Sequence, residues 1–229
     1  MTQAMIRWIF FDLGGTLLDD IPFHDYIYKT LIDMFEERGF NVTMEEFLKA
    51  RNFYVTSRVP ILRSLIVYFT GRNDLKEPMM DELMRRIEGK GPELQKPYPE
   101  AGEVLKEIKR RFKLGIIANQ QVGIRELLKE SGWDELFDVI MISDEVRLQK
   151  PDATIFENAL EMAKCPPTDA VMVGDRIDND IAPARKMGMK TVRFKAGVFA
   201  AQKASGGSET PDAEITSLKQ LPSALANLS

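Results

Sequence analysis

Apolar and polar residues follow different patterns in three parts of the chain. Residues Ile6 to Phe11 form a short apolar run rich in β-branched and aromatic side chains, which is typical of a strand buried on both faces. From residue 22 to residue 96 the apolar residues recur at helical spacing, whereas from residue 97 onward strand-like and helix-like segments alternate. The pattern predicts an α/β protein with a helical block inserted after its first strand.

The helical block should contain four helices. The first ends before Gly39, and the second begins with Thr43 and Glu46 in the spacing of a capping box. The third ends near Gly71, and the fourth runs from Met79 to Ile87 before a Gly- and Pro-containing break. No strand is expected between them, so the block cannot be a single βαβ crossover and should form its own unit. We therefore expect a cap domain of residues 22–96.

The remaining residues, 1–21 and 97–229, should form the core domain. Its predicted strands after the first are residues 114–118, 139–142, 170–173, 190–194 and 213–215, and its predicted helices cover 99–110, 124–128, 155–160 and 181–187. Strands that alternate with helices predict a Rossmann-like parallel sheet with helices on both faces. Only residues 204–211, rich in Ser and Gly, are predicted as a mobile loop.

Composition excludes several classes of protein. The 31 basic and 35 acidic residues give a net charge of -4, so the composition shows no excess of basic residues of the kind that binds nucleic acid. No apolar run approaches the ~18 residues of a membrane span, and the first residues do not resemble a signal peptide. A single cysteine, Cys165, excludes an intrachain disulfide. We expect a soluble, cytoplasmic protein that binds neither nucleic acid nor membranes, and its oligomeric state stays open.

Polar residues follow three of the predicted strands. Asp12 ends the first strand, Asn119 follows the second, and Asp175 follows the fourth, with Lys150 between the last two. A charge at the end of a buried strand is costly unless something uses it, although a lone aspartate could merely cap a turn. Carboxyl ends of parallel strands form the ligand-binding edge of a sheet. Two aspartates and a lysine at this edge suit Mg²⁺ and a phosphate group.

With these motifs the sequence resembles the haloacid dehalogenase superfamily, in its phosphatase branch with a helical cap after the first strand. The resemblance covers almost the whole chain. It rests on four motifs in order: FDLGGTL at Phe11–Leu17, GIIAN at Gly115–Asn119, KPD at Lys150–Asp152 and GDRIDND at Gly174–Asp180.

The resemblance implies a mechanism and a metal. Asp12 would attack phosphorus and form an aspartyl-phosphate, and Lys150 would steady both Asp12 and the phosphate. Mg²⁺ would be held by Asp12, the backbone carbonyl of Gly14 and Asp175. Thr16 and Asp180 would support the site.

Two positions depart from the family pattern. Gly14 stands where the phosphatases carry an aspartate that protonates the leaving group and later activates water, a function worth typically ~10²–10⁴-fold in rate. Ala118 stands where a Ser or Thr usually binds phosphate, which leaves Asn119 and backbone groups for that purpose. Metal binding needs only the carbonyl of Gly14 and should survive both changes.

Residues of the cap could complete the site. His24, the only histidine, lies twelve residues after Asp12 near the start of the first cap helix. It could serve as a substitute proton donor when the cap closes, or it could simply be a solvated residue. Arg51, Arg58 and Arg63 could bind an anionic substrate or form a solvated helix face.

Three functions are compatible with the sequence. The first is a Mg²⁺-dependent phosphatase, weakened by the loss of its acid, that acts on a small phosphorylated metabolite. The second is a dehalogenase, in which Asp12 attacks carbon without a metal; the intact motif at Gly174 and Asp175 argues against it. The third is a non-catalytic protein that binds a phosphorylated ligand or has a regulatory role, which Gly14 and Ala118 together favour.

Overall fold

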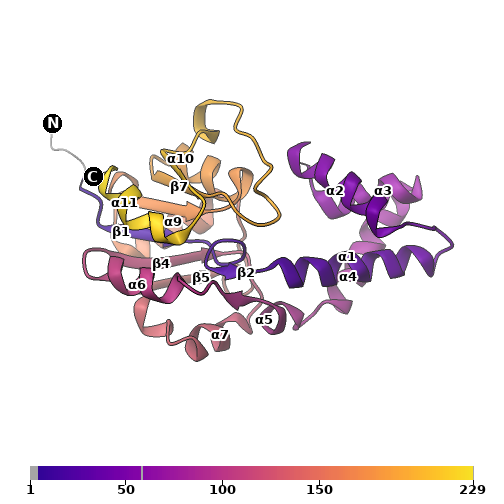
Figure 1. The fold of residues 1–229 in the computed structure, drawn as a ribbon, viewed down its shortest axis with the longest axis horizontal. Helices are drawn as coiled ribbons and strands as arrows, with labels where there is room; N and C mark the ends of the chain where they lie inside the picture. Colours follow the sequence, from indigo (N-terminus) through magenta and orange to yellow (C-terminus); the bar gives the residue numbers. More distant parts are fainter. Residues whose placement is uncertain (1–4, 58, 229) are drawn as a thin grey trace.

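The computed structural model describes residues 5–57 and 59–228. Its core is a six-stranded parallel sheet in the order β5-β4-β1-β6-β7-β8. The strands are β1 (Trp8–Phe11), β4 (Lys113–Ala118), β5 (Val139–Ile142), β6 (Ala170–Gly174), β7 (Lys190–Phe194) and β8 (Ala213–Ile215). The predicted α/β fold with a Rossmann-like parallel sheet is confirmed, and Figure 1 shows the sheet at one end of an elongated molecule.

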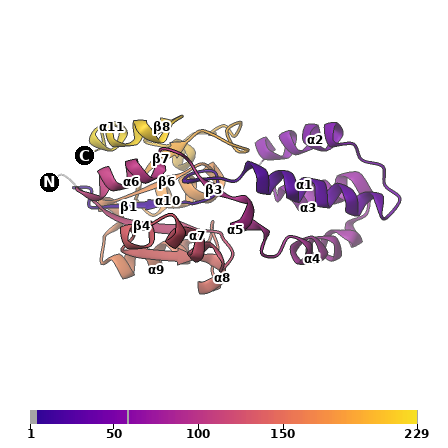
Figure 2. The same cartoon turned by 60° about the horizontal axis from the view of Figure 1, so that its bottom comes forward.

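Helices cover both faces of the sheet. Along β1, Ile9 and Phe11 pack into one apolar layer, whereas Trp8 and Phe10 pack into the other. The first layer includes residues of α6 (Ala101–Lys109), α7 (Ile124–Glu130) and α11 (Leu221–Ala226), and the second includes α9 (Ala153–Ala163) and α10 (Ala182–Lys186). Figure 2 shows α6 and α11 on one side of the sheet and α9 on the other. Burial on both faces explains why β1, β4, β5 and β6 are largely apolar runs.

The order of the strands creates a crevice at their carboxyl ends. The chain places β4 and β5 on one side of β1, and then β6, β7 and β8 on the other. In open α/β sheets such a change of direction is where ligands bind. The loops that follow β1, β4 and β6 therefore meet at one edge, and they carry Asp12, Asn119 and Asp175.

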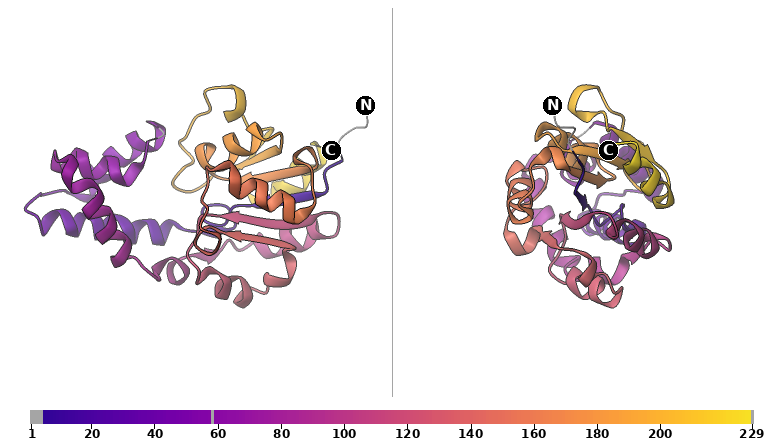
Figure 3. Two further views of the ribbon diagram at one scale, coloured as in Figure 1. Left: turned by 180° about the vertical axis from the view of Figure 1, so that it is seen from behind. Right: turned by 90° about the vertical axis from the view of Figure 1, so that its left-hand side faces the viewer.

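The helical cap is inserted between β1 and β4. It consists of α1 (Ile21–Glu36), α2 (Met44–Ser57), α3 (Ile61–Thr70), α4 (Lys76–Arg86) and α5 (Lys90–Leu94), and its helices enclose a separate apolar core. Thr43 and Glu46 form the predicted capping box, with the Glu46 amide 3.3 Å from Thr43 Oγ1 and the Thr43 amide 3.0 Å from Glu46 Oε2. Gly71 ends α3 with φ of 65°. Figure 3 (left) shows the cap to one side of the sheet.

Several short elements differ from the sequence prediction. The predicted break near residues 89–92 contains α5, and a two-stranded antiparallel ribbon, β2 (Leu18–Asp19) with β3 (Lys96–Pro97), joins both connections at the base of the cap. The structure also contains α8 (Ser143–Val146), α11 and a turn of π-helix at Ile177–Ile181 before α10. Two to six residues are too few to show a period. Because β3 begins within the predicted cap range, the boundaries at residues 22 and 96 stay a prediction.

Candidate active site

Three buried aspartates from two loops meet at the carboxyl edge of the sheet. Asp12 follows β1, Asp175 follows β6, and Asp180 lies in the π-helical turn. Carboxylate oxygens of the three lie within 4.8 Å of one another. So much negative charge in a buried place requires compensation by positive charge.

Lys150 supplies part of that compensation. Its side chain is only 1% exposed, and its Nζ lies 2.8 Å from Asp12 Oδ1 and 2.6 Å from Asp180 Oδ1. Burial alone would lower the pKa of Lys150, but the charges of Asp12 and Asp180 outweigh it and raise that pKa. Lys150 therefore stays charged and fixes the orientation of the Asp12 carboxylate.

Asn119 holds the backbone of Lys150. The Lys150 amide donates to Asn119 Oδ1 at 2.8 Å, and Asn119 Nδ2 donates to the Lys150 carbonyl at 2.9 Å. The sequence predicts Asn119 as a phosphate ligand, and one amide hydrogen is left for such a contact, which stays a prediction. The contacts that the structure shows hold the Lys150 backbone in position.

Asp175 carries the unpartnered oxygen of the site. Its Oδ1 is buried and finds no hydrogen-bond partner within the described part of the chain. Burial and the charges of Asp180, Asp12 and Asp20 raise the pKa of Asp175 well above its usual range. A hard cation such as Mg²⁺, which prefers one or two carboxylates, would satisfy this oxygen. The residues present therefore fit the predicted Mg²⁺, with Asp12, Asp175 and the carbonyl of Gly14 as its predicted ligands.

Asp180 and Thr16 occupy supporting positions. Asp180 uses both oxygens on protein groups, because Oδ1 accepts from Lys150 and Oδ2 accepts from the Arg176 amide at 3.0 Å. Thr16 is fully buried in the β1 loop, and its Oγ1 finds no partner among residues 5–57 and 59–228. Asp180 thus orients Lys150, and its supporting role near the metal stays a prediction.

Mg²⁺ affinity should depend on pH because the ligands must lose protons. Burial, against the opposing charge of Lys150, raises the pKa of the Asp12 carboxyl from 3.8 to about 6. Below that pH the protonated form competes with the metal, so affinity should fall on acidification, by about tenfold between pH 7 and pH 5. Calorimetry in buffers that differ in ionisation enthalpy should detect proton release on binding. Equal affinity at the two pH values would contradict the assignment of Asp12 as a ligand.

Gly15 packs directly against the Asp175 carboxylate. Its φ is 69°, and a Cβ atom at this position would lie 2.6 Å from Asp175 Oδ2. Gly15→Ala should therefore displace Asp175 and weaken Mg²⁺ binding at least ~10-fold, in addition to ~1–2 kcal/mol of backbone strain. Gly39→Ala is the matched control, because Gly39 has φ of 80° but open space around its Cβ. Equal Mg²⁺ affinities in the two variants would contradict this role of Gly15.

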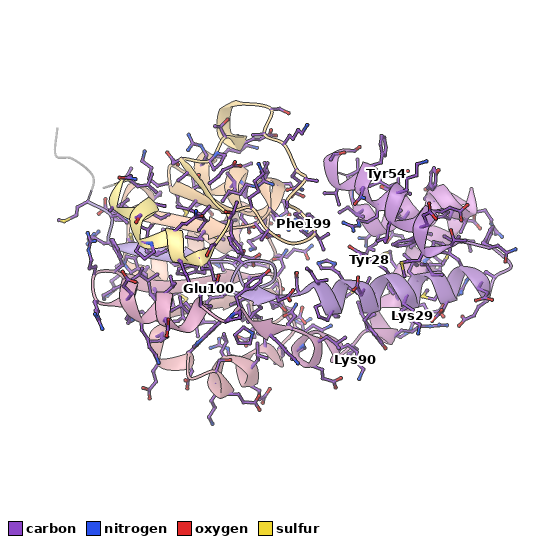
Figure 4. All side chains as sticks on the ribbon, in the orientation of Figure 1. Tyr28, Lys29, Tyr54, Lys90, Glu100 and Phe199 are labelled. Carbon is purple, nitrogen blue, oxygen red and sulfur yellow. The ribbon has the colours of Figure 1, made fainter. Side chains whose placement is uncertain are left out.

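A cavity of about 470 Å³ lies over the site, between core and cap. His24, for which the sequence left both a site role and a solvated position open, lines this cavity, with Nε2 3.3 Å from Asp20 Oδ2 and Nδ1 3.4 Å from the Tyr28 hydroxyl. The loop after β7 approaches from the core, and its Phe199 packs edge-on against the His24 ring at 5.9 Å. Figure 4 shows Phe199 and Tyr28 on opposite sides of the gap between the two parts.

Arg51 and Arg63 make contacts within the cap. Arg51 stacks over the Tyr28 ring at 5.4 Å, Arg63 pairs with Glu77 at 3.1 Å, and Arg58 lies outside the described residues. Anion binding by these arginines therefore stays a prediction. The arginine that lines the cavity is Arg176 of the core, which the sequence analysis does not single out.

Three further cavity residues are absent from the sequence prediction. Asp20, Gln95 and Arg176 line the cavity, and the guanidinium of Arg176 stacks 4.3 Å from the Phe199 ring centroid. Arg176 could have been found from its place in the GDRIDND motif. Asp20 and Gln95 flank the two connections to the cap, and no motif marks them.

A protein-family model described as haloacid dehalogenase-like hydrolase matches residues 9–194. Glyceraldehyde 3-phosphate phosphatase from Methanocaldococcus jannaschii is 29% identical over 98% of this chain and 99% of its own. The protein of the same name from Pyrococcus furiosus is 31% identical, over 94% of this chain and 91% of its own. The crystal structure of 2-haloacid dehalogenase from Pseudomonas syringae superposes with a TM-score of 0.63 at 28% identity, covering 98% of this chain and all of that one.

Proposed function

Because this chain belongs to the haloacid dehalogenase-like hydrolase family, we propose that it is a Mg²⁺-dependent phosphatase that acts on a small phosphorylated metabolite. The two archaeal relatives match almost from end to end and are named for a phosphorylated three-carbon sugar. A substrate of that size suits a cavity of about 470 Å³ lined by residues of core and cap. Within this proposal the cap comprises residues 22–96 and the core comprises the rest.

The unpartnered Oδ1 of Asp175 carries the proposal. A dehalogenase that works without a metal would leave this buried carboxylate uncompensated beside Asp12 and Asp180. Burial raises the pKa of Asp175, so without a cation this carboxyl group would hold a proton more readily, whereas a bound cation would stabilise its charged form. The likeness to the Pseudomonas dehalogenase keeps that reaction as a second candidate, but the three clustered carboxylates favour phosphate chemistry.

Each residue of the site has a part in the reaction. Asp12 supplies the nucleophilic oxygen. Lys150 Nζ lies 2.8 Å from Asp12 Oδ1 and fixes this carboxylate, and the positive charge of Lys150 offsets the charge of the phosphate. Asn119 keeps Lys150 in place through its backbone. A bound Mg²⁺ would neutralise charge on the transferring phosphoryl group. The cap excludes water from the aspartyl-phosphate until the alcohol has left.

A panel of substrates tests the proposal. Wild-type protein should release phosphate from glyceraldehyde 3-phosphate or other small phosphorylated metabolites in Mg²⁺, and the rate should fall to background in EDTA. Halide release from 2-haloacids in EDTA would support the dehalogenase instead. Binding of phosphorylated compounds with no release of phosphate or halide would support a non-catalytic, phospho-ligand-binding protein.

A further inference from the structure

The space beside Gly14 is already filled by another carboxylate. A Cβ atom built on Gly14 would lie 3.0 Å from Asp20 Oδ2, 3.1 Å from Gln120 Nε2 and 3.6 Å from Gln95 Nε2. Gly14, unlike Gly15, does not adopt a positive φ, so its backbone would accept a side chain. A side chain at position 14 would therefore crowd the ends of the Asp20, Gln120 and Gln95 side chains, and these would have to shift, Asp20 first among them.

Asp20 is built into the site. It is 8% exposed, precedes the first residue of α1 and lines the same cavity as Asp12 and Lys150. Successive turns of α1 place His24 and Tyr28 behind it. His24 Nε2 lies 3.3 Å from Asp20 Oδ2, and the Tyr28 hydroxyl lies 3.4 Å from His24 Nδ1.

His24 itself is poorly placed to protonate a substrate. Both of its ring nitrogens face protein partners, so the imidazole would have to break one of these contacts to reach a leaving group. Asp20 Oδ2 contacts His24 Nε2 and is also the oxygen that lies beside the place of a Cβ on Gly14. The carboxyl group of Asp20 is thus the proton carrier that is nearest to the place of the missing aspartate.

We propose that Asp20, held by His24, performs the acid–base function that the family pattern assigns to position 14. This inference rests on the proposed phosphatase function and deepens it. Asp20 acts as a catalytic residue that touches the leaving oxygen, and His24 acts as a positioning residue.

Asp20 gives up one proton in the first half of the reaction and regains one in the second half. In the first half, Asp12 forms a bond to phosphorus, the bond from phosphorus to the substrate oxygen breaks, and that oxygen takes the proton from the Asp20 carboxyl. The products are an alcohol, the aspartyl-phosphate and the Asp20 carboxylate. In the second half, water attacks phosphorus and gives its proton to Asp20, the bond from phosphorus to Asp12 breaks, and inorganic phosphate leaves.

Substitution of Asp20 should affect substrates according to their leaving groups. Asp20→Asn should lower kcat/KM for alkyl phosphates such as glyceraldehyde 3-phosphate by about 10²-fold, because an alkoxide needs protonation to leave. Hydrolysis of p-nitrophenyl phosphate should fall less than about fivefold, since its leaving group needs little help. Asp25→Asn is the matched control, as Asp25 is an exposed aspartate on the same helix and should retain wild-type rates on both esters. Mg²⁺ affinity should be retained in both variants.

Moving the carboxylate back to position 14 provides a second test. Removing the Asp20 side chain opens the space into which a residue at 14 would extend, so Gly14→Asp combined with Asp20→Ser should exceed Asp20→Ser alone by at least ~10-fold on alkyl phosphates. Gly14→Asp by itself should show no gain, because the new side chain would crowd and repel the Asp20 carboxylate, whose Oδ2 lies 3.0 Å from the place of the added Cβ. His24→Asn should lower alkyl-phosphate rates by about tenfold and activated-ester rates less.

The outcomes separate this inference from the proposed function. If Asp20→Asn hydrolyses alkyl phosphates as fast as wild type while Asp12→Asn is inactive, the acid assignment is overturned and the phosphatase stands. If Asp20→Asn slows both classes of ester equally, Asp20 has only a structural role and the inference fails. If wild type hydrolyses no phosphate ester, both are overturned. Should Asp20→Asn not fold, the double variant decides the question.

Discussion

Asp12→Asn should abolish phosphate release, lowering kcat/KM by at least ~10³-fold with every ester, since loss of a nucleophile typically exceeds loss of an acid. An amide oxygen is too weak a nucleophile to attack phosphorus, even though it fills the same volume. It can still accept the contact that Lys150 Nζ makes at 2.8 Å with Oδ1, so the variant should fold. Steady-state phosphate release at saturating Mg²⁺ measures the effect.

Asp81→Asn is a suitable control for this substitution. Asp81 is exposed on α4 and does not line the cavity over the site, so its neutralisation should leave the rate unchanged. An Asp12→Asn variant that keeps a tenth or more of the wild-type rate would contradict the role of Asp12.

Lys150→Met should lower the free energy of unfolding by about 3–5 kcal/mol, because it leaves two buried carboxylates without their shared cation. Both partners are buried in the fold, and Lys150 contacts them at 2.6 and 2.8 Å. The same change should remove activity, since the phosphate would then lie beside Asp12 and Asp180 without the cation that offsets their charge. Urea unfolding at pH 7 without Mg²⁺ measures the effect on stability.

Lys29→Met controls for the loss of a lysine. Lys29 lies on α1 and is exposed, and Figure 4 shows its position on the cap helix. Its substitution should change the stability by less than about 0.5 kcal/mol. Equal destabilisation by the two substitutions would show that Lys150 is not the central cation of a buried network.

The sequence predicts the sheet well because its strands are buried on both faces. β1, β4, β5 and β6 are largely apolar for this reason, and the bounds of β5, β7 and β8 agree with the predicted ranges. The cap helices are predicted because their apolar residues recur at helical spacing and because the Thr43 box and Gly71 mark their ends. Three short features are missed: the ribbon of β2 and β3, α5, and the π-helical turn. Each is too short to show a repeating pattern of apolar and polar residues.

The site is only partly predictable for a related reason. Asp12, Lys150 and Asp175 can be found because they stand at strand ends or in a motif of fixed order. The contact of Asn119 with the Lys150 backbone cannot be found, because it depends on how two loops far apart in the chain meet. Asp20 is missed because the loop after β1 folds over the Leu13 carbonyl, which accepts from Thr16, Leu17 and Leu18 amides. The path of this loop, rather than the spacing of the two residues in the sequence, brings the Asp20 side chain close to Gly14.

The most direct test of the account is the fate of water oxygen during many turnovers in ¹⁸O-labelled water. If Asp12 attacks phosphorus, water later attacks the same phosphorus, so mass spectrometry should find the label in the released phosphate. With a phosphate ester whose alcohol carries no carbonyl group, the Asp12 carboxylate and the released alcohol should remain unlabelled. If Asp12 instead attacked carbon, water would attack the resulting ester at the carboxyl carbon. Label in the peptide that contains Asp12, or in the alcohol, would therefore contradict the account.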